Sequence, residues 1–361
     1  MRGDDQQQGA MFSYLSPKKR VSEDHPLRAI RAISDPALKE LSSEFDRLYA
    51  VSGRPSIAPE KLLRALLLHV LYTIRSERLL MEQLDYNLLF RWFVGLNDEA
   101  VWVPTVFSNN RDRLLAGDIA SAFFEGVVGK LREKNLLSDE HFTVDGTLLE
   151  AWAGAKSFRR KDGKGEPPEG GSNPTVNFHG EQRSNATHES TTDWEARLAT
   201  KAKGKEAKLS YAGHVLMENR NGLIVTTQVS KATGTAESEA ALEMAEEVSG
   251  DRRVTLGGEK GYDQKKLVEA LRRENVTPHV ARNEKRPGGS AIDKRTSRHE
   301  GYEISQRVRK RVEEIFGWMK TIGLMRKLRH RGEERLGWKF TFTAAVYNLV
   351  RARNLLAKAS R

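Results

Sequence analysis

Three acidic residues stand where an α/β domain could bring carboxylates together. Asp145 ends a run of aromatic and β-branched residues, 142–144, that favours a strand. Glu259 follows a second short strand, 253–256, and two glycines, and Glu313 lies in a long stretch with helical periodicity. Hard divalent cations such as Mg²⁺ take carboxylate oxygens as ligands, and paired ions can stabilise both oxygens of a phosphodiester exchange. The three residues together predict metal-dependent phosphodiester chemistry, although Asp145 alone also suits an ordinary turn at a strand end.

Helical geometry relates Glu313 to nearby basic residues. One long helix is predicted for residues 302–323. At ~100° per residue, Glu313 falls ~40° and Lys320 ~20° from Arg309, on one stripe at the edge of the apolar face. Glu314 points ~100° away from Glu313, towards solvent. Arg309 and Lys320 are therefore assigned to phosphate binding, with a solvated basic face as the alternative.

The charge balance indicates an anionic partner, with double-stranded DNA first. The 361 residues carry a net charge of +11, and residues 303–361 hold 15 Lys or Arg against 5 Asp or Glu. Lys310 and Arg311 belong to this basic segment and are also predicted to bind DNA. The absence of cysteine excludes disulfides and thiolate metal sites. No apolar run reaches the ~18 residues of a membrane span, so a cytoplasmic, nucleoid-associated protein is expected.

Four segments are expected along the chain. Residues 1–25 resemble a flexible arm, and 26–135 a helical domain for DNA binding or dimerisation. Residues 136–335 form the α/β domain, which contains a basic, turn-rich loop at 154–208, and 336–361 form a basic C-terminal helix. Within the helical domain, the predicted N-caps are Asp35 (with Pro36 as the first helical residue), Ser108 and Asp118.

The order of elements after residue 141 is that of a mixed α/β domain. Strands at 209–217 and 223–229 are joined by Asn219-Arg-Asn-Gly222, which is typical of a hairpin turn. Helix 235–248, strand 253–256, helix 263–275 and strand 277–280 follow. Three strands and then alternating helices and strands is the order of a ribonuclease H-like domain.

Three motifs extend this pattern to a family resemblance. Phe142-Thr-Val-Asp-Gly-Thr147, Thr255-Leu-Gly-Gly-Glu-Lys-Gly-Tyr-Asp263 and Arg309-Lys-Arg-Val-Glu-Glu-Ile-Phe-Gly-Trp-Met-Lys320 resemble the acidic motifs of bacterial insertion-sequence transposases. The most similar group is the one named after insertion sequence five, whose Arg-x3-Glu-x6-Lys signature the last motif fits. The resemblance covers nearly the whole chain, including the helical stretch Leu62 to Leu96.

The resemblance implies a function and a set of ligands. Such a protein would bind the terminal inverted repeats of its element as a homodimer or larger assembly, cut to free 3′-OH ends and join them to target DNA. Asp145 would bridge two Mg²⁺ ions, or Mn²⁺ in their place, with Glu259 and Glu313 each completing the ligands of one ion.

Two departures from the family pattern leave alternatives open. This chain has Glu259 where the family has Asp, and Gln306 where it has Tyr. Asp263 is an alternative ligand, although it resembles a helix cap. His188 and His214 are left out of the site as ordinary polar residues. The alternatives to an active transposase are a catalytically impaired copy that only binds DNA and, with less support, a structure-selective nuclease.

Overall fold

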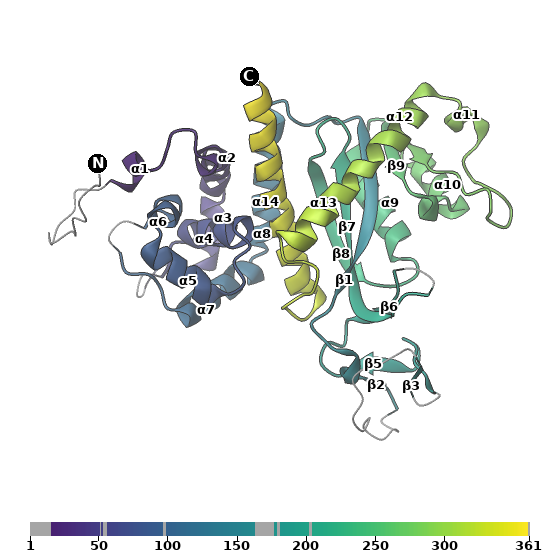
Figure 1. Ribbon diagram of the computed structural model, residues 1–361. Coiled ribbons are helices and arrows are strands. Elements are labelled where there is room, and N and C mark those ends of the chain that lie inside the picture. Colours follow the sequence, from purple (N-terminus) through teal and green to yellow (C-terminus); the bar gives the residue numbers. More distant parts are fainter. Residues whose placement is uncertain are drawn as a thin grey trace, which may run out of the picture.

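A helical part and an α/β part lie side by side, with the C-terminal helix between them (Figure 1). The computed structural model describes residues 16–50, 52, 56–96, 99–162, 177–178, 181–201 and 204–359. Most of the arm predicted for residues 1–25 lies outside these ranges, and its described end contains one helical turn, α1 (Pro17–Arg20). None of the helices in the described ranges is long and apolar enough to cross a membrane.

Seven helices follow α1 in the described helical part. They are α2 (Pro26–Glu40), α3 (Ser42–Leu48), α4 (Pro59–Leu71), α5 (Glu77–Tyr86), α6 (Leu88–Val94), α7 (Pro104–Ala116) and α8 (Ile119–Glu133). Two of the predicted N-caps are wrong. Pro36 lies inside α2, and Asp35 pairs with Arg31 and Arg64 at 3.0 and 2.9 Å instead of capping a helix. Ser108 lies inside α7, because Pro104 occupies the first turn.

The central sheet confirms the ribonuclease H-like fold. Its main strands are β1 (His141–Glu150), β7 (Lys208–Glu218), β8 (Ile224–Lys231), β9 (Val254–Gly258) and β10 (Val276–Val280). Their order is β10-β9-β1-β7-β8, where β7 is antiparallel to both of its neighbours and β9 and β10 run parallel to β1. The predicted turn before Gly222 joins β7 to β8, and the buried Glu218 carboxylate accepts hydrogen bonds from backbone N–H groups of that turn.

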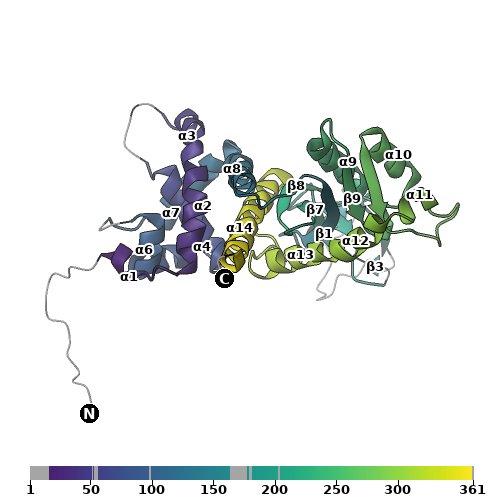
Figure 2. The ribbon, with the colours of Figure 1, turned by 90° about the horizontal axis from the view of Figure 1, so that it is seen from above.

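Helices cover both faces of this sheet (Figure 2). One face carries α9 (Ala236–Ser249) and α10 (Lys265–Arg273), and the other carries α12 (Glu300–Val308) and α13 (Val312–Thr321). The single helix predicted for 302–323 is therefore wrong: a 3₁₀ turn, η3 (Arg309–Arg311), separates α12 from α13. Along β1, Phe142 and Val144 pack in the core beneath α9, whereas Leu149 packs in the core shared with α13. Since strand side chains alternate, the odd-numbered residues of β1 face α13.

The last helix, α14 (Glu333–Ala359), belongs to the core of both parts. It lies between α8 and β8, and Phe342 stacks on Trp338 at 5.2 Å and contacts Phe123 of α8 at 5.8 Å between ring centroids. The Asn348 amide bonds both the N–H and the C=O of Ile224 in β8, at 2.8 and 2.7 Å. The helix predicted for 336–361 is the greater part of α14, and nearly half of the residues of α14 are buried.

The described residues of the stretch predicted as a basic loop, 154–208, contain short strands. β2 (Phe158–Arg160) pairs with β5 (His188–Ser190), and β6 (Arg197–Ala199) extends the central sheet beside β7. The Tyr211 hydroxyl of β7 donates to buried Asp193 at 2.6 Å and so fastens this region to the sheet. Residues 163–176, 179–180 and 202–203 lie outside the described ranges.

Candidate active site

Asp145 lies where the parallel neighbour of β1 ends. The prediction that Asp145 ends its strand is wrong, because β1 continues to Glu150. β9 pairs only with residues 141–143 of β1, so on that side the sheet is open from residue 144 up to Glu150, which forms a parallel bridge with Lys327. The half-buried Asp145 carboxylate accepts a hydrogen bond from the N–H of Gly146 at 2.8 Å. Its pKa is raised to about 7, chiefly by burial and also by neighbouring carboxylates.

Glu259 is one of those neighbours. It follows β9 directly, and its side chain is 53% exposed. Its Oε1 accepts from Nη1 of Arg309 at 3.1 Å. A Cβ at Gly257 would lie 3.0 Å from Thr143 Oγ1, which is a tight contact, whereas the Cβ of Arg309 would lie at an ordinary contact distance of 3.8 Å. The glycine therefore favours close packing of β9 against β1, and η3 lies in contact with the end of β9.

Glu313 lies on α13, which runs along β1 between two fixed contacts. Just before α13 begins, Arg309 donates a hydrogen bond to Glu259. Near the end of α13, Lys320 Nζ donates to Thr147 Oγ1 at 2.6 Å. Glu313 is exposed and lies one turn beyond Arg309. Glu314 is also exposed, but it lies near Tyr347 of α14, where it adds to the effect of burial in raising the pKa of that hydroxyl. The two adjacent glutamates therefore face different surroundings.

Asp145, Glu259 and Glu313 do not form a complete set of metal ligands in this structure. Asp145 and Glu259 interact electrostatically, but no three His, Asp or Glu side chains of the described residues come close enough together to hold one metal ion. Two adjacent carboxylates at an open sheet edge, one with its pKa raised to about 7, nevertheless leave negative charge that a divalent cation would neutralise. Carboxylate oxygens are the ligand type that Mg²⁺ and Mn²⁺ prefer, so the chemistry of these two side chains suits such a cation.

Glu237 is a further carboxylate close to Asp145 and Glu259, and the sequence did not point to it. We call the part of the sheet where these three carboxylates lie the acidic edge. It lies in the first turn of α9, where its carboxylate sits between Gly146 and Gly261: Oε1 is 3.5 Å and Oε2 4.0 Å from the Cβ positions of those glycines. Its pKa is raised by burial and by the charge of Glu259. Gly146 is even-numbered, so Glu237 approaches from the α9 face, opposite to the face that Asp145 shares with α13.

Two further buried groups line the same edge. Tyr262 is 3% exposed, and its hydroxyl has no hydrogen-bond partner among the described residues. Burial raises its pKa well above the usual value, and the charges of Asp145, Glu237 and Glu259 add to the effect. His214 bonds Ser230 Oγ through Nε2 at 3.0 Å, and burial lowers its pKa to about 4, which keeps the ring neutral. Its Nδ1 lies 3.0 Å from the Cβ position of Gly146, so this histidine borders the site after all.

Asp263, the alternative ligand, has a structural role. It is 1% exposed, its Oδ2 accepts from the N–H of Asn283 at 2.7 Å and its Oδ1 from that of Ala291 at 2.9 Å. The helix α10 begins at Lys265 with Gln264 as its N-cap. Asp263 is therefore not the helix cap suggested by the sequence, and both of its oxygens are occupied by the loop that follows β10.

The predicted DNA-binding residues face different directions. Arg309 and Lys320 lie against the acidic edge, and burial together with Lys201 and Arg326 lowers the pKa of Lys320. Lys310 is exposed. Arg311 donates to the backbone carbonyls of the β7–β8 turn, Asn219 and Arg220, both at 3.3 Å, so it is turned away from Asp145.

The chain is similar to known transposases in sequence. A family model described as Transposase domain (DUF772) matches residues 15–113, and one described as Transposase DDE domain matches residues 175–349. Glu259 and Glu313 lie in the second range, and Asp145 lies between the two. No curated protein matches the sequence.

Solved structures similar to this chain share little sequence with it. A piggyBac transposase synaptic complex with hairpin DNA aligns with 93% of this chain and 76% of that one, at 10% identity and a TM-score of 0.39. A pre-cleavage Mos1 transpososome aligns with 87% of this chain and 82% of that one, at 10% identity and a TM-score of 0.20.

Proposed function

Since the chain carries a transposase domain and a transposase DDE domain, we propose that it is an insertion-sequence transposase. It binds the terminal inverted repeats of its element, in the manner of the group named after insertion sequence five, and catalyses strand cleavage and strand transfer. The observation that supports this most is the adjacency of Asp145 and Glu259 at the open edge of the sheet, with the Asp145 pKa raised to about 7.

Asp145, Glu259 and Glu313 hold Mg²⁺ or Mn²⁺ in this proposal. Bound there, such cations would supply positive charge that acidifies the attacking water or 3′-OH and stabilises the leaving 3′ oxygen. Asp145 would contribute a ligand oxygen from a rigid strand. Oε1 of Glu259 is bonded to Arg309 at 3.1 Å, so metal binding through that oxygen would release Arg309. The freed Arg309 guanidinium then binds a phosphate of the DNA strand, and Lys320 holds a neighbouring phosphate. DNA binding and assembly of the ligand set are thereby coupled.

In this proposal, double-stranded DNA binds the basic side chains of residues 303–361. The excess of 15 Lys or Arg over 5 Asp or Glu in residues 303–361 favours phosphate contacts, and a dimer or larger assembly would hold both transposon ends. The domain limits for these roles are residues 26–135 for DNA binding or dimerisation and 136–335 for catalysis. Because α14 is buried between them, it acts as their common support and not as an independent DNA-binding tail.

A second candidate function is that of a catalytically impaired copy that only binds DNA. The longer Glu259 side chain and its ion pair with Arg309 favour this alternative. Nicking of a supercoiled plasmid in Mg²⁺ or Mn²⁺ separates the two, with Asp145→Asn as the inactive control. Metal-dependent nicking by the parent and none by Asp145→Asn supports the transposase. DNA binding without nicking in either metal supports the impaired copy.

A further inference from the structure

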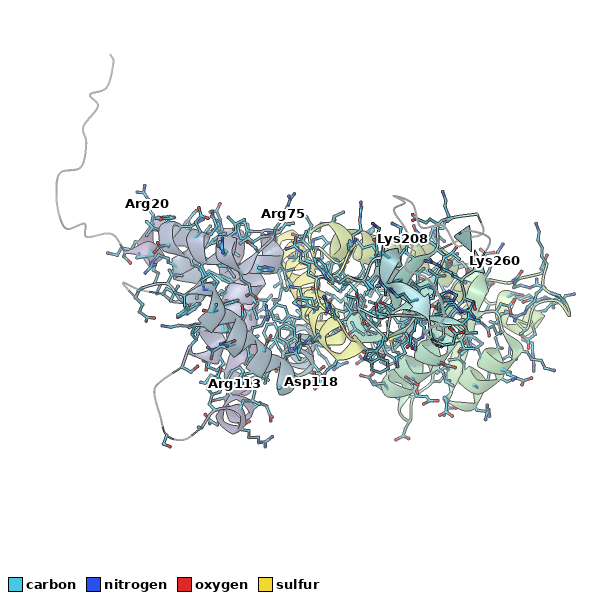
Figure 3. All side chains as sticks on the ribbon, turned by 90° about the horizontal axis from the view of Figure 1, so that it is seen from below. Arg20, Arg75, Arg113, Asp118, Lys208 and Lys260 are labelled. Atoms are coloured by element: carbon cyan, nitrogen blue, oxygen red, sulfur yellow. The ribbon has the colours of Figure 1, made fainter. Side chains whose placement is uncertain are left out.

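A cavity of about 250 Å³ lies between the helical part and the segment that leads into α14. Side chains from α4, α5 and α7 line one side, and residues 323–339 line the other. Arg75 marks its edge and lies far from Lys260, the neighbour of Glu259, in Figure 3. None of the acidic residues of the candidate active site lines this cavity.

We call the part of the cavity lined by the exposed Arg329 and Arg335 and the half-buried Lys339 its mouth. The positive charge of these three side chains is not compensated by ion pairs. Arg111 is paired with Glu77 and Asp112, but Arg329, Arg335 and Lys339 form no ion pair with any described residue. Burial lowers the pKa of Lys339 to about 8, and the charges of Arg111 and Arg329 contribute. An anion bound among these cations would relieve their mutual repulsion.

Two neutral histidines, His69 and His330, also line the cavity. Burial, together with nearby cations, lowers the pKa of His69 to about 3 and that of His330 to about 4. Both rings are therefore neutral at pH 7 and can donate or accept hydrogen bonds. A phosphate beside these rings could accept hydrogen bonds from their N–H groups and interact with the nearby positive charges.

The interior of the cavity is apolar and contains one unsatisfied donor. Leu66, Val70, Leu328 and Leu336 contribute to its lining. Trp338 lines it too, is 7% exposed, and its Nε1 has no hydrogen-bond partner among the described residues. A buried N–H without a partner costs about 1–3 kcal/mol, which a ligand acceptor would recover.

We propose that this cavity binds a single nucleotide, with the phosphate at Arg329, Arg335 and Lys339 and the base in the apolar interior beside Trp338. Its volume of about 250 Å³ lies just below the roughly 300 Å³ lower end of small-molecule sites, so it has room for one nucleotide at most and not for a base pair. The nucleotide is either free or the unpaired end of a DNA strand. This site is separate from the acidic edge and does not depend on strand cleavage.

Calorimetric titration of the full-length protein tests the proposal with dAMP, deoxyadenosine and inorganic phosphate. We expect dAMP to bind about tenfold more tightly than either fragment, because it uses both the charged mouth and the apolar interior. Arg335→Ser and Lys339→Met should each weaken dAMP binding about tenfold, since each removes a phosphate contact. Arg331→Ser is the matched control: Arg331 is exposed, lies two residues after Arg329 and does not line the cavity.

Further measurements identify the source of the nucleotide and keep the test independent of catalysis. A duplex with one unpaired terminal nucleotide that displaces dAMP better than a blunt duplex assigns the site to DNA ends, and equal displacement assigns it to a free nucleotide. Asp145→Asn should bind dAMP like the parent even though it cannot nick. Parental dAMP affinity in folded Arg335→Ser and Lys339→Met, no dAMP binding by the parent, or equal affinity for inorganic phosphate would each overturn the proposal.

Discussion

Asp145 and Glu259 lie at the same level of the sheet, because each follows by two residues the last β1–β9 pair, Thr143 and Gly257. Beyond that pair the two strands separate, and the space between them is where the two carboxylates influence each other. Glu259 is partly neutralised by Arg309, whereas Asp145 is more buried and has its pKa raised to about 7. The length of the Glu259 side chain therefore decides how close its carboxylate can come to that of Asp145.

Shortening Glu259 tests its assignment as a ligand. Glu259→Asp should raise Mg²⁺-dependent plasmid nicking, because the extra methylene displaces the carboxylate by roughly 1.5 Å where placement within about 0.5 Å is needed. Mn²⁺ should help the parent more than the Asp variant, and Glu259→Ala should abolish nicking in both metals. Asp263→Asn should instead lower the melting temperature, since Asp263 fixes the loop through Asn283 and Ala291. An active Glu259→Ala protein would exclude Glu259 from the site.

The neighbouring glutamates of α13 form a matched pair of variants. Glu313→Gln should lose metal-dependent nicking by at least about a hundredfold, because it removes a proposed metal ligand. Glu314→Gln should nick nearly as well as the parent, since Glu314 lies near Tyr347 and not at the acidic edge. Both residues are exposed, so neither change should alter the melting temperature much. The reverse ranking in the nicking assay would contradict the assigned register of α13.

The contact between the sheet and α14 predicts a stability effect at Gly213. A Cβ there would lie 2.7 Å from a ring carbon of Phe340 and 2.9 Å from Leu149, so Gly213→Ala should destabilise the fold by about 1–3 kcal/mol in urea unfolding. Adding Phe340→Leu should recover part of that loss by making room. Gly317→Ala, where nothing lies within 4 Å of the new Cβ, should be neutral or stabilising by up to about 1 kcal/mol. Equal effects at both glycines would argue against the close packing of α14 on β7.

His279 predicts how stability depends on pH. It is 4% exposed and bonded to Ser305 Oγ at 2.8 Å, and its pKa is lowered to about 4 by burial and by His299 and His141. The folded state therefore binds this proton less readily than the unfolded chain, whose histidines titrate near ~6.5. The stability is present above pH ~6.5 and is lost as the pH falls towards 4, by on the order of 2 kcal/mol. His279→Asn should show a smaller loss between pH 7 and 4.5 in urea unfolding, and an unchanged pH slope would contradict this.

The sequence by itself determined the order of elements in the α/β part and hence its fold class. Strand alternation and the turn before Gly222 are local properties, so the strands near 209–217 and 223–229 were predicted to within a few residues. Asp145 and Glu259 could be singled out for the same reason, because each follows a short strand-forming run. Whether they bind metal stays a prediction.

Tertiary structure alone decided where the remaining residues lie. Pro36 remains inside α2 although proline disfavours a helix interior, because flanking residues such as Ile33 and Leu38 are buried in the core. Glu237 reaches the acidic edge only because α9 packs across the sheet, and a contact between elements 90 residues apart leaves no local pattern. The sequence predicted a basic C-terminal helix at 336–361, and only the tertiary structure placed it between the two parts of the protein, where nearly half of the residues of α14 are buried. Burial of this kind depends on which surfaces meet, and the spacing of residues along one helix does not specify that.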